Sequence, residues 1–310
     1  MTGPAIFIVE DEAIVASDIK ETLISLGYTA AGIAKSGEIA LEKIRDTRPD
    51  LILMDIHLAG EMDGVDTAGK VHALYDIPVI YLTAYADKIL LDRAKVTEPY
   101  GYVVKPYDER ELHSIIEMAL YKHQVEREIK KRDAILFAVS SAVEWLLRIS
   151  REKTSAPTEP RVFKPTDIRD ILEPIGLALD AGSISIFRSQ PDSQGSAVLS
   201  MIYEWGCPEY HSCLYKPELK AFTWASMGLS KWEQQIATGE VVSATMTNIP
   251  KEEQTLFGLL GVKSGVMLPI YIRESLWGII GFFDLVERSR SPDEIEALRI
   301  TANLLGAAMG

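Results

Sequence analysis

The chain of 310 residues has few cysteines, no long apolar run and no excess of basic residues. Its two cysteines, Cys207 and Cys213, form no metal-binding spacing with histidine and do not indicate a disulfide framework. No apolar stretch approaches the about 18 residues that a membrane helix needs, and the amino terminus lacks the basic flank of a signal peptide. The formal net charge of −13 disfavours binding to the phosphates of nucleic acids, which requires a basic surface. We therefore expect a cytoplasmic protein that binds neither membranes nor nucleic acids.

The residues that are present are those of an ordinary globular protein, with 47% hydrophobic and 25% charged side chains. The length exceeds that of a typical domain, so we expect two domains of about 120–150 residues each. Both residues 1–122 and residues 164–310 carry more acidic than basic side chains, so neither part offers a basic face.

Four apolar runs in the first third of the chain are each followed by a loop: residues 5–11, 50–55, 78–83 and 101–105. They alternate with helical patterns at 12–27, 36–46, 63–75, 87–95 and 108–120. This alternation is typical of buried parallel strands in a βαβ sheet. Because the carboxyl ends of parallel strands lie along one edge of a sheet, the residues at the ends of the runs should converge there. These residues are Asp11, Asp55, Thr83 and Lys105.

Two carboxylates, a hydroxyl and an ammonium group suit one kind of chemistry. A carboxylate that attacks a phosphoryl group is opposed by like charge, and Mg²⁺ offsets this by binding oxygen atoms of both groups. The set therefore indicates magnesium-assisted transfer of a phosphoryl group onto a carboxylate.

Residues about 4–122 resemble the receiver domain of phosphorelay response regulators. The resemblance rests on the combination of FIVEDEA, LILMDIHLAGEMDG, VIYLTAYAD and GYVVKPYDERELHSII. It implies an α/β, flavodoxin-like fold with a five-stranded, doubly wound parallel sheet. It also implies a cognate histidine kinase or phosphotransfer protein as partner.

The resemblance assigns roles to the acidic residues. Asp55 would be the phosphoacceptor. Asp11 and Asp55 would bind Mg²⁺ directly, together with the backbone carbonyl of His57, and Glu10 would act through water.

The resemblance also assigns the residues that respond to phosphorylation. Lys105 would pair with a phosphoryl oxygen, and the Lys105–Pro106 peptide bond would be cis. Thr83 would donate to the phosphoryl group, and Tyr102 would rotate inward to fill the vacated space.

The chain contains no ATP-binding kinase motif, so we expect no enzyme activity beyond a receiver's own phosphorylation and dephosphorylation. An alternative of another class is a phosphatase similar to the haloacid dehalogenases. Their Asp-x-Asp nucleophile motif is absent at Asp55-Ile56-His57, which argues against this reading.

The last helix of the first domain, which follows the expected N-cap Asp108, continues without proline or glycine to Arg151. Apolar residues keep a heptad spacing, with Lys122 and Arg132 interrupting the seam. The a positions are Ile115, Ile129, Leu136 and Val143, and the d positions are Met118, Val125, Val139 and Leu146. The pattern favours a parallel dimeric coiled coil. The alternative is an amphipathic helix that packs on its own domain.

The remaining residues show a different order of elements. After a proline-containing linker at 154–166, a helix leads into strands near 183–188 and 197–205 and helical pieces at 230–238 and 251–260. A hairpin of 265–272 and 276–285 precedes a final helix that begins at Ser291. This order predicts an α+β domain with an antiparallel sheet.

The second part resembles a GAF domain, most clearly in VMLPIYIRESLWGIIGFFD and SPDEIEALRITANLLGAAM, with a PAS-like domain as the rival. We thus expect a receiver domain at 1–122, a helical stalk at 123–153, the linker at 154–166 and a GAF-like sensory or dimerisation domain at 167–310. A homodimer would form through the stalk and the GAF-like domain.

Aromatic, cysteine and histidine residues gather in the stretch where GAF domains bind small molecules. The candidate pocket residues are Trp205, Cys207, His211, Cys213 and Trp224. No signature of a cyclic nucleotide, tetrapyrrole or haem is present, and the alternative is aromatic packing in a domain without ligand.

The sequence is compatible with two interpretations of the whole chain. It is either a complete regulator that signals through protein contacts, or the N-terminal regulatory segment of a hybrid histidine kinase whose catalytic core lies further along.

Overall fold

The computed structural model describes residues 3–84, 93, 97–151, 165–193 and 195–309. Contacts divide the chain into two compact units, Met1–Ile129 and Lys130–Gly310. The predicted helix at 87–95, apart from Arg93, and nearly all of the predicted linker at 154–166 lie outside the described residues.

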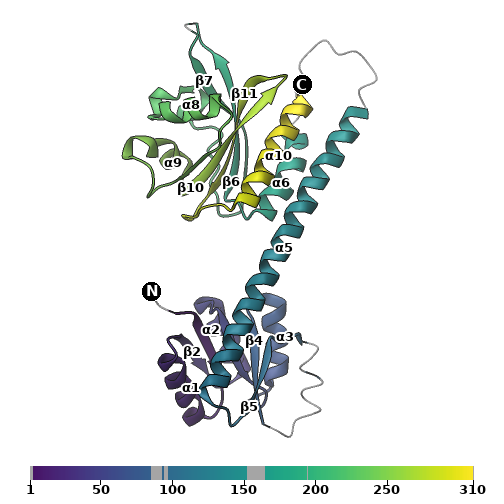
Figure 1. Ribbon diagram of the computed structural model, residues 1–310, viewed down its shortest axis with the longest axis vertical. Helices are drawn as coiled ribbons and strands as arrows, with labels where there is room; N and C mark the ends of the chain where they lie inside the picture. The colour runs from purple at the N-terminus through teal and green to yellow at the C-terminus, as the bar shows by residue number, and fades with distance from the viewer. Residues whose placement is uncertain (1–2, 85–92, 94–96, 152–164, 194, 310) are drawn as a thin grey trace. The chain divides into compact units, whose positions relative to one another are not determined.

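The first unit is a five-stranded parallel sheet with strand order β2-β1-β3-β4-β5 (Figure 1). The strands are β1 Ala5–Val9, β2 Thr29–Ala34, β3 Leu51–Asp55, β4 Val79–Ala84 and β5 Gly101–Lys105. The helices are α1 Ala13–Ser25, α2 Gly37–Thr47, α3 Gly64–Leu74 and α5 Glu109–Arg151. This confirms the predicted α/β fold.

Helices cover both faces of this sheet because the strands are apolar on both sides. One core cluster joins the sheet to α2 and α3 through residues such as Ile44 and Val71. The other joins it to α1 and α5 through Leu23, Leu112 and Ile116. The sheet is therefore doubly wound, as predicted.

The expected N-cap Asp108 is confirmed, and α2 begins at a cap of the same kind. The Ser36 hydroxyl accepts from the backbone N–H of Ile39, at the start of α2. The Asp108 carboxylate accepts from the N–H of Glu111 over 2.8 Å, at the start of α5. Each cap satisfies a backbone donor that the first helical turn leaves unpaired.

The second unit contains a six-stranded antiparallel sheet with order β8-β7-β6-β11-β10-β9. The strands are β6 Ser183–Pro191, β7 Ala197–Gly206, β8 Phe222–Thr223, β9 Val242–Thr245, β10 Ser264–Ile272 and β11 Ser275–Asp284. The helices are α6 Pro165–Ala178, α7 Pro217–Lys220, α8 Ser230–Ala237, α9 Thr255–Leu260 and α10 Pro292–Met309, with 3-10 turns at Ala225–Met227 and Lys251–Gln254. The predicted α+β fold is confirmed.

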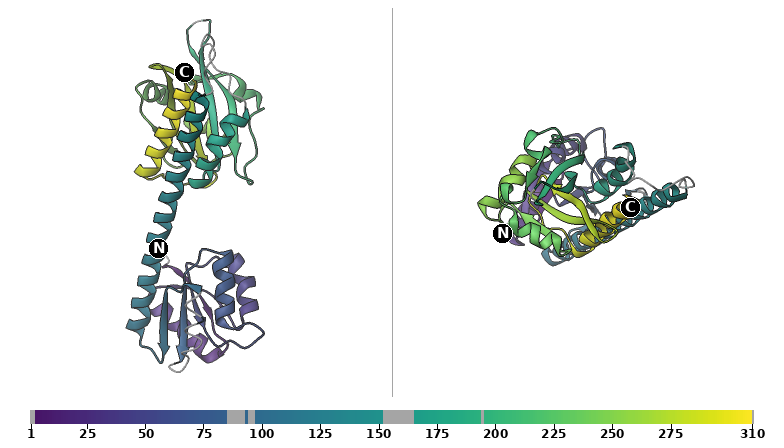
Figure 2. Two further views of the ribbon diagram at one scale, coloured as in Figure 1. Left: turned by 90° about the vertical axis from the view of Figure 1, so that its right-hand side faces the viewer. Right: turned by 90° about the horizontal axis from the view of Figure 1, so that it is seen from above.

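Two apolar layers cover the faces of the second sheet. On one face, α6, α10 and the later residues of α5 pack side by side, as the two views of Figure 2 and Figure 1 agree. On the other face, α8, α9 and the segment around Trp224 pack over Phe283 and Met267.

The helix α5 is continuous over 43 residues, as predicted. Within the second unit it contributes Ala138, Ala142 and Trp145 to the core shared with α6 and α10. Of the heptad seam, Ile129 and Leu136 are 53% and 65% exposed, whereas Ile115 packs against the core of the first unit. The side chain of Leu146 lies outside the described residues. Within the second unit the helix therefore packs one apolar face against the core, and it exposes the apolar side chains of Ile129 and Leu136 to solvent.

The hairpin of β10 and β11 was predicted with a turn at 273–275, and in the structure it turns at Arg273 and Glu274 alone. Both residues have positive φ, 47° and 68°, the left-handed geometry that a two-residue hairpin turn of type I′ requires. Among the described residues, no helix is long and apolar enough to span a membrane.

Candidate functional site

Three neighbouring strands of the first sheet carry polar residues at their carboxyl ends, and the loop after β1 adds two more. Asp55 ends β3, and Glu10 and Asp11 follow β1. Thr83 lies near the end of β4, and Lys105 ends β5. Because β1, β3, β4 and β5 are adjacent in the parallel sheet, these positions share one edge.

Lys105 joins the carboxylates of this edge. Its Nζ donates to Oε2 of Glu10 over 2.7 Å and to Oδ2 of Asp55 over 2.5 Å. The other oxygen of Asp55, Oδ1, accepts from the backbone N–H of His57 over 2.9 Å. Asp55 is only 7% exposed, so both oxygens are held in a largely buried pocket.

Three acidic side chains form the kind of donor set that a hard divalent cation binds. Glu10, Asp11 and Asp55 each offer a carboxylate oxygen, and these atoms all lie within 4.8 Å of one another. Glu10 and Asp55 are buried, whereas Asp11 is exposed. Carboxylate oxygens with an open side for water fit Mg²⁺, which keeps several water ligands.

Burial sets the protonation of this edge. It raises the pKa of Glu10 to about 6, an effect that the hydrogen bond from Lys105 opposes and the neighbouring Asp55 reinforces. Burial alone would lower the pKa of Lys105, but its hydrogen bonds to Asp55 and Glu10 raise it above its ordinary value. Lys105 is therefore charged at neutral pH.

The two residues expected to respond to phosphorylation lie beside this edge. Thr83 is 2% exposed, and its Oγ1 donates to the carbonyl of Ala84 over 3.1 Å. The half-buried ring of Tyr102 stacks on Tyr81, with ring centroids 5.8 Å apart. The Lys105–Pro106 peptide bond is cis, as the resemblance implied.

Comparison with known proteins gives each unit a family. Residues 6–117 match the response regulator receiver domain, and residues 167–309 match the GAF domain. The transcriptional regulatory protein PdtaR of Mycobacterium tuberculosis is 31% identical over 179 residues, which is 53% of this chain and 85% of PdtaR. The chain belongs to the response regulators. It combines a receiver domain with a GAF domain, and its role is in phosphorelay signalling.

Other relatives match different shares of this response regulator. The methanogenesis regulatory histidine kinase FilI of Methanothrix harundinacea is 27% identical over 253 residues, covering 81% of this chain but 25% of FilI. A solved receiver domain of a diguanylate cyclase from Desulfovibrio desulfuricans G20 is 40% identical, with a TM-score of 0.39. It corresponds to 40% of this chain and 98% of that structure.

One further residue of the receiver domain supports the site and was missed from the sequence. A Cβ at Gly64, the first residue of α3, would lie 1.9 Å from the carbonyl oxygen of Asp55. Only glycine allows α3 to begin this close to the end of β3. The signal was the glycine of EMDG, at the start of the third helical pattern, 63–75.

The GAF domain does not bring its five candidate pocket residues together. Trp205 is buried in the layer that contains α6 and α10, whereas Cys213 and Trp224 are buried on the opposite face of the sheet. Cys207 is half-buried and His211 is exposed.

A residue outside that candidate set organises this region of the GAF domain. The Glu204 carboxylate accepts from the backbone N–H groups of Cys213 and Leu214 over 2.8 and 3.2 Å, and from the Tyr210 hydroxyl over 2.9 Å. Glu204 therefore fixes the loop that follows β7. The available sequence signal was a single acidic residue between apolar residues in the strand pattern AVLSMIYEWG.

Proposed function

We propose that Asp55 of the receiver domain accepts a phosphoryl group from a histidine kinase or phosphotransfer protein. The observation that supports this most directly is the bond from Lys105 to Asp55, at an edge that also holds Glu10 and Asp11. An oxygen of Asp55 attacks phosphorus, a P–O bond forms, and the P–N bond of the phosphohistidine donor breaks. The freed imidazole nitrogen keeps the bonding electron pair.

The residues of this edge would have different roles in the transfer. Glu10, Asp11 and Asp55, with the backbone carbonyl of His57, would hold Mg²⁺, directly or through water. A bound Mg²⁺ supplies positive charge that offsets the repulsion between carboxylate and phosphoryl group. Lys105 lies next to Oδ2 of Asp55, where it can neutralise an oxygen of the new acyl phosphate.

Thr83 and Tyr102 would carry the response away from Asp55. The Thr83 hydroxyl now donates to a backbone carbonyl that is a weaker acceptor than a charged phosphoryl oxygen. Turning toward the phosphoryl group would draw the end of β4 inward. Tyr102 would then rotate into the space this leaves.

The response would leave the receiver through α5. This helix packs against the sheet through Leu112, Ile116 and Ala119, and its later residues enter the core of the GAF domain. The exposed seam at Ile129 and Leu136 would pair with the same seam of a second chain.

Phosphorylation with acetyl phosphate and measurement of the intact mass test the site. The wild-type chain and the control Asp46→Asn, which changes an exposed aspartate of α2, should each gain one phosphoryl group when Mg²⁺ is present. Asp55→Asn should gain none. A mass increase that persists in Asp55→Asn, or in excess chelator, would exclude the assignment.

The match to FilI supports a second candidate, in which this receiver–GAF pair regulates a histidine kinase core further along the chain. FilI is similar over 81% of the present chain, yet that region is 25% of FilI. The sequence of the full gene distinguishes the two functions.

A further inference from the structure

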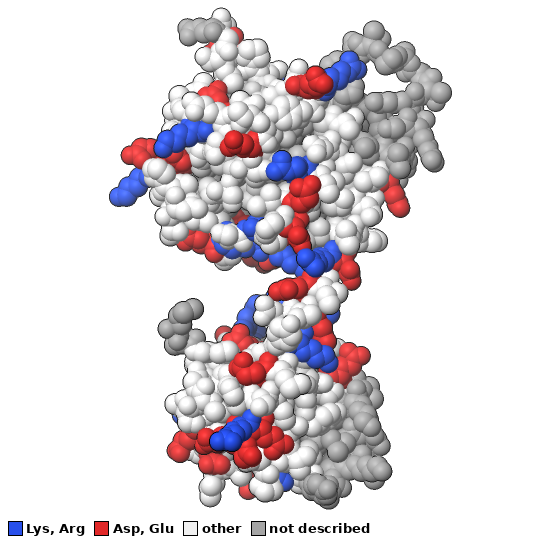
Figure 3. Space-filling model, viewed as in Figure 1, with Lys and Arg blue, Asp and Glu red and all other residues white. Residues whose placement is uncertain are grey.

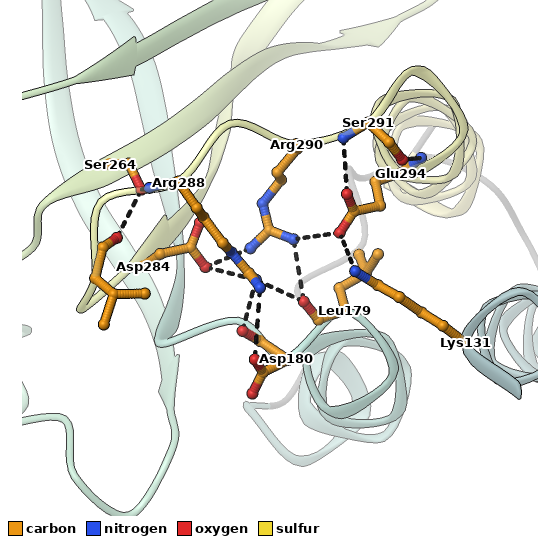
Figure 4. Close-up of polar contacts among 10 residues, drawn as sticks. Lys131, Leu179, Asp180, Ser264, Asp284, Arg288, Arg290, Ser291 and Glu294 are labelled. Atoms are coloured by element: carbon orange, nitrogen blue, oxygen red, sulfur yellow. Dashed lines mark hydrogen bonds and ion pairs between the residues drawn. The ribbon is translucent and has the colours of Figure 1, made fainter. Parts of the chain in front are cut away.

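The first turn of α10 in the GAF domain is closed by a reciprocal cap. The backbone N–H of Ser291 donates to Oε2 of Glu294 over 2.7 Å, and the N–H of Glu294 donates to Oγ of Ser291 over 3.3 Å (Figure 4). This is a capping box, in which two otherwise unpaired donors are satisfied. One oxygen of Glu294 is thus committed to its own helix.

A buried arginine lies behind this cap. The side chain of Arg290 is 1% exposed, and it donates to Oδ1 of Asp284 over 2.6 Å and to the carbonyl of Leu179 over 3.2 Å. Arg288 donates to the same two acceptors, over 2.9 and 2.7 Å. Figure 4 shows these side chains converging between β11, the end of α6 and α10. Removing either Asp284 or Arg290 would leave a buried charge without its partner. Opening this cluster therefore costs much free energy.

The second oxygen of Glu294 is bound from α5. Nζ of Lys131 lies 2.9 Å from Oε1, and the Lys131 side chain is 40% exposed. Arg290 lies 3.5 Å from the same oxygen. Next to this pair, Arg132 of α5 binds Asp293, and both of those side chains are more than half exposed. Figure 3 shows basic and acidic side chains adjoining one another at this end of the GAF domain.

Breaking the contact between Lys131 and Glu294 therefore costs less free energy than opening the buried cluster of Arg288, Arg290 and Asp284. If α5 turned or slid, Lys131 would gain water at its partly exposed end. Glu294 would keep Arg290 and the N–H of Ser291. Because Lys131 is 40% exposed and the buried Glu294 keeps Arg290 nearby, we expect the two states to differ by a small free energy.

We propose that the Lys131–Glu294 pair is a releasable latch that fixes α5 on α10 of the GAF domain, and that movement of α5 after phosphorylation opens it. The signalling half of this proposal rests on the proposed function, whereas the latch itself does not. Lys131 and Glu294 are positioning residues, since neither touches the phosphoacceptor edge.

The latch is tested first in the unphosphorylated full chain by hydrogen exchange. Lys131→Met should speed exchange about fivefold in residues 130–137 and 291–298, because a partly exposed ion pair holds these segments together. Lys131→Arg should stay at the wild-type rate, as should Lys231→Met, which changes an exposed lysine of α8.

Glu294→Gln shows whether the effect passes through this partner. Glutamine can also close a capping box, so α10 keeps its first turn. In this background Lys131→Met should cause no further change. Wild-type exchange in Lys131→Met, or an effect of equal size in the Glu294→Gln background, would overturn the latch.

Beryllofluoride with Mg²⁺, as a phosphoryl mimic, tests the signalling half. In the wild-type chain exchange should change both in the receiver, at residues 51–84, and at residues 291–298. In Lys131→Met only the receiver should change. If the change at 291–298 persists in Lys131→Met, the latch is not the path. If the receiver does not respond in either protein, the proposed function fails, and with it the signalling half.

Discussion

Nζ of Lys105 lies 2.5 Å from Oδ2 of Asp55, although 50 residues separate them in the chain. The parallel sheet produces this contact because β3 and β5 flank β4 and end at the same edge. The ammonium group also binds Glu10, so it holds together two carboxylates that would repel each other.

Replacing Lys105 with methionine should therefore lower the stability of the receiver domain. Glu10 and Asp55 would lose a shared charged partner, and we expect a loss of about 1–2 kcal/mol in Mg²⁺-free buffer at pH 8. Urea denaturation measures this. Lys20→Met, which changes an exposed lysine of α1, serves as the control and should leave the transition unchanged. Equal stability of Lys105→Met and wild type would contradict the role of Lys105 as the link.

Glu10 should make the stability of the receiver depend on pH. Its pKa is raised from the ordinary 4.5 to about 6, so the folded chain holds this proton more tightly than the unfolded chain. The stabilising contribution is therefore complete below about pH 4.5 and is lost as the pH rises through about 6.

Glu10→Gln should consequently be more stable than wild type above pH 6, by about 1 kcal/mol, when a chelator removes Mg²⁺. The difference should disappear near pH 4.5. Thermal unfolding across this pH range measures it, with Glu12→Gln as an exposed neighbouring control. A variant that is less stable than wild type at pH 8 would show that the bond to Lys105 outweighs the cost of burial.

The sequence predicted the residues of the phosphoacceptor edge better than it predicted the short strands and the packing faces of the chain. The ends of strongly apolar strands are easy to find, and the parallel order then brings Asp55, Thr83 and Lys105 together. The strand β2, TAAGIA, was not among the apolar runs because small residues dominate it. The two-residue β8 and the four-residue β9 give too short a pattern to recognise.

In two further places the structure differs from the sequence-based prediction because of the direction in which side chains point. Trp205 and Cys213 are close in sequence, but Trp205 alternates onto one face of β7 while the loop that contains Cys213 folds over the other. On α5, the face formed by Ala138, Ala142 and Trp145 was missed, because alanine contributes little to an apolar pattern beside the larger residues of the heptad.

The hairpin turn between β10 and β11 offers a stabilising substitution. Glu274 has φ of 68°, a conformation that costs about 1 kcal/mol for a residue with a side chain and little for glycine. Glu274→Gly should raise the melting temperature of the GAF domain by about 2 °C. Glu240→Gly, at an exposed loop glutamate that is not among the positive-φ residues, should lower it instead. A lower melting temperature for Glu274→Gly would mean that the glutamate side chain stabilises the turn.

The exposed seam of α5 leads to the last prediction, that the chain is a dimer. Ile135 packs against the core of the GAF domain, and Leu136, one residue or about 100° further around the helix, is 65% exposed. One helix can therefore serve its own domain and a second chain at the same time. Leu136→Glu would place a charge in the seam, and burying an unpaired charge is costly. Light scattering at tens of micromolar should report a dimer for wild type and a monomer for Leu136→Glu. Ala134→Glu, at an exposed position about 200° around the helix from Leu136, should remain dimeric. If wild type is a monomer, the exposed seam does not join two chains.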